Sequence, residues 1–187
     1  MNYPVEYKKL VLEAIERIDL EKVNEAIVWF QEARDAGRRI FVCGNGGSSA
    51  TASHFAADMF KGAGENSPKR FRILALTDSV PTLTAYSNDV GYDAVFVEQL
   101  RNFAEPGDIL MALSGSGNSP NVLRAMEYAN SVGCRTIALT GRNGGKLGPL
   151  ARLNIQIDVP HMGRIEDAHM IVCHMIFYCF MDTEGAA

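Results

Sequence analysis

Three serines lie within six residues, at Ser114, Ser116 and Ser119, directly after a short apolar run. Two glycines between them let the backbone turn sharply, and Pro120 suits the first turn of a following helix. Hydroxyl groups and free amides at a helix start favour an anion such as phosphate, and no basic residue is needed. A simple turn, with Ser119 as an ordinary helix cap, would explain the same residues without a ligand.

A second loop of this kind follows an earlier apolar run at residues 44–48, where the sequence reads GNGGS. Two separate segments then carry groups that suit an anion, which strengthens the phosphate interpretation. Neither loop has the Walker pattern, GxxxxGK followed by Ser or Thr, or the dinucleotide pattern GxGxxG. We therefore expect no nucleotide or other organic cofactor.

Titratable side chains form two further groups. His54 and Asp58 are four residues apart and so share one face of a helix, with mostly apolar neighbours around Asp58. Glu166 and His174 interrupt a strongly apolar segment, and polar groups in such a segment need an explanation. An ordinary surface carboxylate would explain Asp58 and a hydrogen-bonded core histidine would explain His174; for His169, on a different face, the core interpretation is favoured.

The elements that position these residues alternate along the chain. Apolar side chains recur at helical spacing in two stretches from about Val5 to Ala36, which predicts a helical hairpin. Five apolar runs predict strands, the last of them weaker: 39–43, 73–76, 108–113, 136–139 and 154–159. Helical patterns at 48–61 and 165–180 complete an α/β fold with a parallel sheet covered on both faces. Ligands of such sheets bind beyond the carboxyl ends of the strands, where the Gly- and Ser-rich loops fall.

Length and composition exclude several classes of protein. At 187 residues, with 47% hydrophobic and 21% charged side chains, the chain predicts one ordinary globular domain. A net charge of −4 offers no basic field for nucleic acid. The four cysteines show no C-x-x-C pair and are expected to be reduced core residues. Because no leader pattern and no long apolar stretch occurs, we expect a cytoplasmic protein with no membrane partner.

The order of the motifs resembles a known family. The sequence contains, in this order, GNGGS at 44–48, Asn88 with Asp89, SGSGNS at 114–119, LTG at 139–141 with a glycine pair at 144–145, RIE at 164–166 and His174. This order is similar to that of the sugar isomerase (SIS) domain family, and most similar to the phosphoheptose isomerases, over nearly the whole chain.

That resemblance implies more than the residues do alone. It implies a flavodoxin-like five-stranded parallel sheet flanked by helices, within a single SIS domain of residues 1–187. Residues 1–36 would form the N-terminal helical hairpin and 37–187 the α/β core. It also implies a homotetramer with active sites at subunit contacts, and an aldose–ketose isomerase that acts on sedoheptulose 7-phosphate.

The resemblance implies roles for particular residues. Asp58 and His174 match the catalytic positions of the phosphoheptose isomerases, where the base and acid of an enediol mechanism are needed. The family's zinc site matches His54, Asp58, Glu166 and His174, which are all competent ligands. Glu166 and His174 lie about 12 Å apart along a helix and must both lean inward to share one ion. The substrate-binding positions are Asn45, Gly46, Gly47, Ser48, Asn88, Asp89, Ser114, Gly115, Ser116, Ser119 and Glu166.

Three departures from the family pattern concern the substrate. Gly115 stands where the family has threonine, Gly163 where it has aspartate, and Asp58 where it has the longer glutamate. The shorter side chain of Asp58 retracts its carboxylate by about 1.5 Å, and misplacement of that size can cost about 100-fold in rate. A non-catalytic SIS protein that binds a sugar phosphate or a protein partner is therefore the main alternative. A different SIS chemistry, such as an etherase acting on an amino-sugar derivative, is a third.

Overall fold

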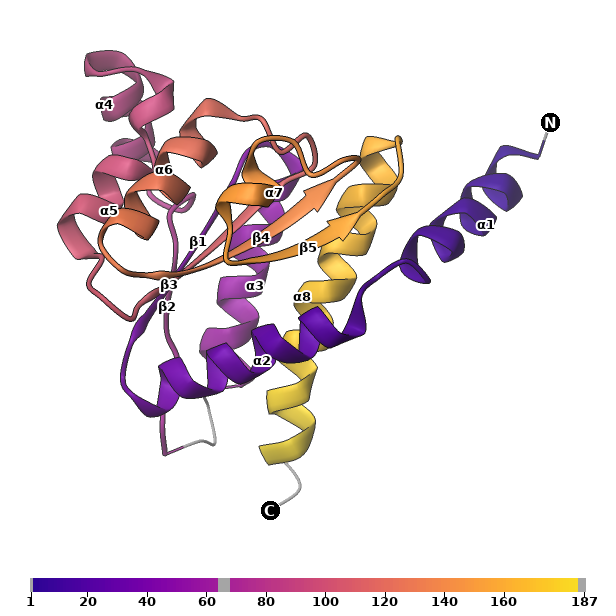
Figure 1. Cartoon of the computed structure of the whole chain (residues 1–187), viewed down its shortest axis with the longest axis horizontal. Helices are drawn as coiled ribbons and strands as arrows, with labels where there is room; N and C mark the ends of the chain where they lie inside the picture. The colour runs from indigo at the N-terminus through magenta and orange to yellow at the C-terminus, as the bar shows by residue number, and fades with distance from the viewer. Residues whose placement is uncertain (1, 64–67, 185–187) are drawn as a thin grey trace.

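The computed structural model describes residues 2–63 and 68–184 (Figure 1). Within them a sheet of five parallel strands runs in the order β2-β1-β3-β4-β5. The strands are β1 (Arg39–Gly44), β2 (Arg72–Ala75), β3 (Ile109–Ser114), β4 (Arg135–Gly141) and β5 (Leu153–Ile157). This is the flavodoxin-like order, in which the chain reverses direction across the sheet between β1 and β3 and a crevice opens at the carboxyl ends of these two strands. The predicted fold class is confirmed.

The strands form because their apolar residues are buried on both faces of the sheet. In β1, Ile40 and Val42 belong to one hydrophobic cluster, whereas Phe41 and Cys43 belong to the other. The same alternation continues in β3, where all six residues are buried. Continuous apolar runs of this kind are stable only when helices cover both faces.

Helices from different parts of the chain cover the two faces. The cluster around Ile40 is completed by α2 (Leu20–Asp35), α3 (Gly47–Lys61) and α8 (Met162–Glu184). The cluster around Phe41 is completed by α5 (Val97–Phe103), α6 (Pro120–Ser131) and α7 (Leu147–Leu150). The remaining helices are α1 (Tyr3–Ile15), α4 (Val80–Asp89) and a short 3₁₀ turn, η1 (Tyr92–Ala94). The helices that cover the Ile40 face matter for function, because α3 and α8 pack side by side and carry the titratable residues singled out in the sequence.

The N-terminal helices differ from the predicted hairpin. Both α1 and α2 form, but each packs on α8, and Figure 1 shows α1 extending outward from the body instead of folding back on α2. The apolar residues of α1 explain the difference: Ala14 alone is buried, whereas Tyr3, Val5 and Leu12 are exposed. One monomer therefore leaves much of the apolar face of α1 uncovered.

Element boundaries agree with the sequence to within a few residues. The predicted last helix at 165–180 is longer, spanning Met162–Glu184, and the strand predicted at 154–159 is β5 at Leu153–Ile157. Helices α4 and α5, which the periodicity did not identify, connect β2 to β3. Among the described residues, no helix has the length and apolar character needed to cross a membrane.

Candidate active site

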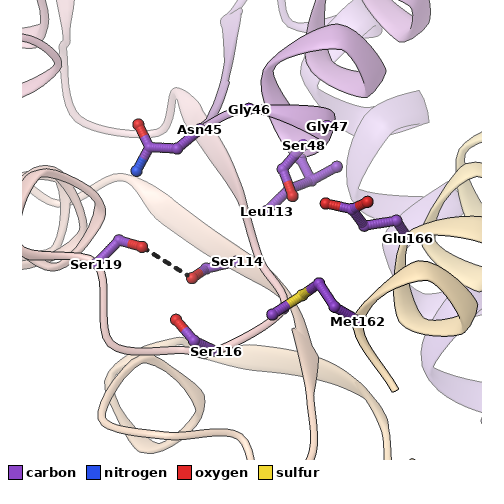
Figure 2. Close-up of a pocket in the computed structure, with 11 residues that line it drawn as sticks. Asn45, Gly46, Gly47, Ser48, Leu113, Ser114, Ser116, Ser119, Met162 and Glu166 are labelled. Atoms are coloured by element: carbon purple, nitrogen blue, oxygen red, sulfur yellow. Dashed lines mark hydrogen bonds between the residues drawn. The ribbon is translucent and has the colours of Figure 1, made fainter. Parts of the chain in front are cut away.

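A pocket of about 250 Å³ opens at the carboxyl ends of β1 and β3 (Figure 2). The two strands are neighbours in the sheet, with Gly44 paired with Leu113, so the loops that follow them must lie side by side. The lining residues are Asn45, Gly46, Gly47, Ser48, Leu113, Ser114, Gly115, Ser116, Ser119, Met162 and Glu166. Both Gly- and Ser-rich loops singled out in the sequence therefore contribute to one cavity.

The serine hydroxyls of the loop after β3 can donate to a ligand. The Ser114 oxygen accepts a bond from the Gly117 amide at 3.2 Å, and the Ser116 oxygen accepts one from the Asn118 amide at 3.2 Å. An oxygen that accepts from an amide keeps its own O–H free to donate. The Ser114 and Ser119 hydroxyls hydrogen-bond to each other at 3.4 Å across the loop, so one of these two O–H groups is used there until a ligand replaces it; three hydroxyls gather at one end of the pocket (Figure 2).

The structure also tests the alternative interpretation of Ser119. Although this residue occupies the N-cap position of α6, its side chain makes no capping hydrogen bond. At α3 the N-cap residue is Gly46, with φ of 56°, and no side chain caps this helix either. Two helix starts whose N-cap residues make no side-chain capping bond therefore border the pocket, although Asn121 Oδ1 accepts the Val122 amide in the first turn of α6. The other amides at these helix starts, together with the helix dipoles, favour an anion.

The glycines after β4 support the serine loop rather than contact a ligand. A Cβ on Gly117 would lie 2.2 Å from the Gly144 carbonyl oxygen, and one on Gly145 would lie 2.6 Å from the backbone of Gly117. These loops therefore touch backbone to backbone, which only glycine permits. The Leu147 amide also donates to the Gly117 carbonyl at 2.9 Å. The shape of the serine-rich loop thus depends on its neighbour.

Two other glycines leave room for pocket side chains. A Cβ on Gly47 would lie 2.6 Å from Glu166 Oε1, which places that carboxylate against the N-terminal end of α3. A Cβ on Gly115 would lie 2.4 Å from Met162 Sδ, so the thioether occupies the volume that any side chain at 115 would need. The first turn of α8 therefore forms the wall of the pocket opposite Ser119 (Figure 2). Among the lining residues, Glu166 alone is titratable.

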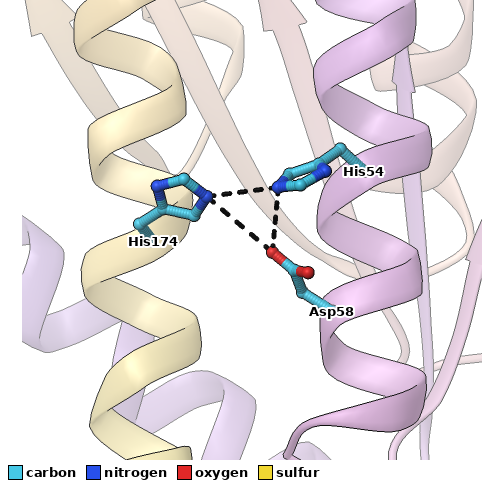
Figure 3. Close-up of side chains that lie close together, drawn as sticks. All are labelled: His54, Asp58 and His174. Atoms are coloured by element: carbon cyan, nitrogen blue, oxygen red, sulfur yellow. Dashed lines mark hydrogen bonds and ion pairs between the residues drawn. The ribbon is translucent and has the colours of Figure 1, made fainter.

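A second polar group bridges α3 and α8 (Figure 3). His54 Nε2 lies 3.2 Å from His174 Nε2 and 3.2 Å from Asp58 Oδ2, and the second histidine lies 3.8 Å from the same carboxylate oxygen. The side chains of His54 and His174 are 49% and 41% exposed, so a substrate or an ion can reach them. Neither the surface-carboxylate nor the core-histidine interpretation fits this arrangement.

The geometry of this triad of His54, Asp58 and His174 suits a metal ion. Ligand atoms of a tetrahedral zinc site, bound at about 2.0–2.1 Å, lie about 3.3 Å from one another. The three observed separations of 3.2, 3.2 and 3.8 Å are close to that spacing. Two imidazole nitrogens and a carboxylate oxygen are also ordinary zinc ligands. The donor set therefore fits zinc, with one coordination position open.

Two predicted site residues lie outside both the pocket and the triad, and a third, Glu166, belongs to the pocket alone. Glu166 is not part of the triad, because its carboxylate points into the pocket at Gly47. Asn88 and Asp89 lie at the exposed C-terminal end of α4, where Asn88 Nδ2 donates to Asp89 Oδ1 at 2.7 Å, and neither lines the pocket. One chain thus brings the two Gly- and Ser-rich loops together and forms the triad, but it does not bring Asn88 and Asp89 to either of them.

Other titratable groups in the interior have structural roles. His169 is buried and its Nε2 lies 3.1 Å from the Thr140 carbonyl, to which it donates in the neutral form. Burial lowers the pKa of His169 to about 4, so it stays neutral. Burial raises the pKa of the Cys43 thiol to about 12 and that of Cys134 to about 11, which makes both poor nucleophiles. These residues belong to the core, as expected.

The sequence did not identify four residues that shape the site. Leu113 and Met162 line the pocket, and Asn121 and Tyr92 hydrogen-bond to Asn45 at its edge. Position along the chain could have suggested Met162, because it follows the last predicted strand and starts the last helix. Nothing local distinguishes Tyr92, which reaches Asn45 because η1 packs against α6, at the same edge of the pocket.

Comparisons with known proteins agree with this geometry. Residues 5–141 match the SIS domain family. The chain is 42% identical over 157 residues to a probable phosphoheptose isomerase from Thermoplasma volcanium, covering 84% of this chain and 78% of that protein. The solved phosphoheptose isomerase from Neisseria gonorrhoeae superposes with a TM-score of 0.88 at 33% identity, covering 95% and 96% of the two chains. That from Francisella tularensis superposes with a TM-score of 0.90 at 26% identity, covering 97% of both.

Proposed function

Because this chain belongs to the SIS domain family and, within it, to the phosphoheptose isomerases, we propose that it is an aldose–ketose isomerase. Its substrate is sedoheptulose 7-phosphate, which it converts to the aldoheptose phosphate. The observation that carries the proposal is the pocket between β1 and β3, where three serine hydroxyls and two uncapped helix starts meet. A histidine and carboxylate group on the adjoining helices supplies the means of proton transfer.

The pocket orients the sugar phosphate. Its phosphate lies at Ser114, Ser116 and Ser119, where hydroxyls and amides can donate to it. Glu166 stands at the opposite side, and its carboxylate repels the phosphate while it accepts hydrogen bonds from sugar hydroxyls. The two ends of the substrate are thereby distinguished without any basic residue among the lining residues.

The reaction moves one proton between the first two carbons of the sugar. Asp58, as the base, removes the proton from the carbon next to the carbonyl, and the electron pair left behind forms the double bond of an enediol. His174, as the acid, gives a proton to the carbonyl oxygen in the same step. Return of the first proton to the neighbouring carbon, with loss of a proton from the other oxygen to His174, gives the isomer. Protons and electrons balance, and no redox cofactor is required.

A metal ion fits beside this pair. His54, Asp58 and His174 would hold zinc, and the bound ion would polarise the substrate carbonyl as a Lewis acid in place of proton donation from His174 Nε2, which would then be a ligand. Glu166 would complete the proposed set of four ligands only from a second chain, because in its own chain it lies in the pocket about 12 Å along α8 from His174.

We propose a homotetramer in which neighbouring subunits complete the active site. Within one chain, His54 lies about 10 Å along α3 from Gly47, so the triad and the pocket are separated. Tyr3, Val5 and Leu12 of α1 and Tyr178 and Met181 of α8 are exposed, which is unfavourable in a monomer but suits subunit contacts. Association along α1 and α8 would bring the triad of one subunit to the pocket of another. It could also bring in Asn88 and Asp89.

The remaining expectations stay proposals. We propose that residues 1–187 act as one SIS domain that needs no nucleotide or organic cofactor and binds no nucleic acid or membrane. Four cysteines that form no disulfide, three of them buried, fit a reducing compartment such as the cytoplasm. The binding-protein alternative would leave the converging triad without a role, and the etherase alternative has no feature of the site in its favour.

Exchange of substrate hydrogens with deuterated water tests the chemistry. His174→Ala and Asp58→Asn should each abolish exchange at C1 or C2 of sedoheptulose 7-phosphate, yet keep phosphate-dependent binding within a few-fold of wild type. Asp58→Glu should raise activity because the added methylene extends the reach of the base. If the wild type exchanges no hydrogen with any C5 to C7 ketose or aldose phosphate, with or without zinc, the chain is a binding protein and not an isomerase.

Mixing two inactive variants tests the shared site. The variant Ser116→Ala with Ser119→Ala lacks the phosphate contacts, and His174→Ala lacks the acid. If loop and triad come from different subunits, random mixing restores about a quarter of the sites in a symmetric oligomer. Refolding the two variants together should then recover activity that neither shows alone. No recovery, or a monomer mass by light scattering at micromolar concentration, would contradict the proposed assembly.

A further inference from the structure

The side-chain amide of Asn45 is held by two neighbours at the edge of the pocket. Its Oδ1 accepts one bond from Asn121 Nδ2 at 2.9 Å and another from the Tyr92 hydroxyl at 2.8 Å. Its Nδ2 donates to Asn121 Oδ1 at 2.9 Å. The two asparagines therefore form a reciprocal pair, and the tyrosine fills the second acceptor position of Asn45.

A backbone amide determines the direction of this pair. Asn121 is 2% exposed, and its Oδ1 also accepts a bond from the Val122 amide at 3.0 Å. A backbone N–H can only donate, so this atom of Asn121 must be the oxygen and its other terminal atom must be the nitrogen. The partner atoms of Asn45 follow from that assignment. Turning either amide over would place two donors or two acceptors against each other.

The capacity that remains on Asn45 is a single N–H. A carboxamide offers two acceptor positions and two donor hydrogens, and both acceptor positions and one hydrogen are already used. In Figure 2 the nitrogen of the Asn45 amide is on the side of the group that faces Ser119. The free hydrogen therefore belongs to the part of the pocket where the serine hydroxyls gather.

From this geometry we infer that Asn121 and Tyr92 are positioning residues that hold Asn45 as an obligate hydrogen-bond donor. Asn45 then recognises an oxygen with lone pairs, on the phosphate or on the sugar, and finds no partner in an ammonium or amide N–H. The pocket consequently discriminates against amino-sugar phosphates whose nitrogen would meet Asn45. This inference rests on the proposed binding of a sugar phosphate, but it does not require that the protein isomerise it.

Titration with inorganic phosphate, followed by NMR, tests the donor without any reaction. The side-chain amide signals of Asn45 are identified by their loss in Asn45→Ala. Phosphate should shift one of the two Asn45 amide protons, the one that faces the pocket, and leave the one bonded to Asn121 in place. Equal shifts of both protons, or no shift while the Gly47 and Ser48 amides respond, would overturn the inference. A response of Asn45 in a protein without isomerase activity would refute the proposed function alone.

Tyr92→Phe tests the positioning role in the intact chain. Tyr92 is 56% exposed, so loss of its hydroxyl leaves the fold intact. Removing one hydrogen bond to Asn45 frees its amide to turn, and KM for sedoheptulose 7-phosphate should rise about two- to tenfold while kcat stays within twofold. Tyr128→Phe is the matched control, because it loses a hydroxyl on α6 away from the pocket and should change neither constant. An unchanged KM in Tyr92→Phe, or a loss confined to kcat, would contradict the role.

Asn121→Asp removes the bond that fixes Asn45. The aspartate keeps the shape and the acceptor for the Val122 amide, but it presents a second oxygen where Asn121 donates to Asn45. A carboxylate oxygen then opposes the Asn45 oxygen in either orientation of the amide, so Asn45 leaves the pair and no longer directs its N–H at the ligand. Sugar-phosphate affinity should fall by about 30-fold or more, beyond the effect of Asn45→Ala, because the carboxylate also repels the anion. Thermal unfolding identifies any variant that fails to fold. A folded Asn121→Asp protein with wild-type affinity would overturn the inference.

Discussion

The contact between Gly115 and Met162 yields a quantitative prediction about the pocket wall. In Gly115→Ala the new Cβ would lie 2.4 Å from Met162 Sδ, whereas ordinary contacts begin at 3.4 Å, so the sulfur must retreat by about 1 Å. The next nearest atoms are both at 3.4 Å: Ile165 Cγ2 need not move, and Met162 Cε moves with the sulfur to which it is bonded. Met162 is 37% exposed and its side chain is flexible, so it has room to rotate.

The expected cost follows from this geometry. Overpacking lowers the free energy of unfolding by about 1–3 kcal/mol. Gly115→Ala should lower it by about 1 kcal/mol, because one flexible side chain moves to relieve the overlap. Gly141→Ala should lower the free energy of unfolding by about 3 kcal/mol or more. Its Cβ would lie 2.4 Å from Ile165 Cδ1 and 2.6 Å from the Gly115 carbonyl oxygen, and a backbone atom cannot rotate away. A displaced thioether also narrows the pocket. Because a misplacement of about 1 Å can cost up to 100-fold, kcat/KM for Gly115→Ala should fall about tenfold or more.

A double-mutant cycle checks the reasoning. Urea unfolding and kcat/KM are measured for wild type, Gly115→Ala, Met162→Ala and the double variant. Removing the thioether should relieve the overlap, which gives a coupling energy of about 1 kcal/mol in stability and a partial recovery of kcat/KM. Gly141→Ala combined with Met162→Ala is the control and should show no rescue. If the changes in the free energy of unfolding caused by Gly115→Ala and Met162→Ala add to within about 0.5 kcal/mol in the double variant, the contact between the two residues is not the cause of the destabilisation.

Three other predictions concern the phosphate, the carboxylate and the buried histidine. Ser116→Ala with Ser119→Ala should weaken sugar-phosphate binding about tenfold or more with a nearly unchanged melting temperature, and calorimetry showing unaltered affinity would contradict it. Glu166→Gln should bind inorganic phosphate more tightly, because the repulsion between the two negative charges is removed. It should bind sedoheptulose 7-phosphate more weakly, because an acceptor for sugar hydroxyls is lost. A change of both affinities in the same direction would contradict the proposed orientation of the substrate. His169 has a folded-state pKa of about 4, below its ordinary value of 6.5, so the unfolded chain binds its proton first. The free energy of unfolding therefore carries no penalty from His169 above pH 6.5 and falls as the pH drops towards 4, by about 2 kcal/mol at pH 5. His169→Gln should lose that part of the pH dependence, which urea unfolding at several pH values measures.

Much of the fold and part of the site could be predicted from the sequence, because their causes are local. Short apolar runs such as 108–113 favour strands of a sheet covered on both faces, and their alternation with helices favours parallel pairing. Parallel strands bring the loops that follow them to one edge, so GNGGS at 44–48 and SGSGNS at 114–119 had to be considered together. The spacing of His54 and Asp58 likewise determined that they share a face of α3.

Tertiary structure alone decided the contacts that depend on how these elements pack. Glu166 and His174 share a helix, but the packing of α8 against α3 directs the first into the pocket and the second into the triad. The outward course of α1 depends on apolar residues that find no cover in one chain. Met162 and Tyr92 reach the pocket from segments remote in sequence, and no local pattern records which side chain fills the space above a glycine or completes an amide pair. Such contacts follow from the relative positions of whole elements, which are determined by the core they bury together.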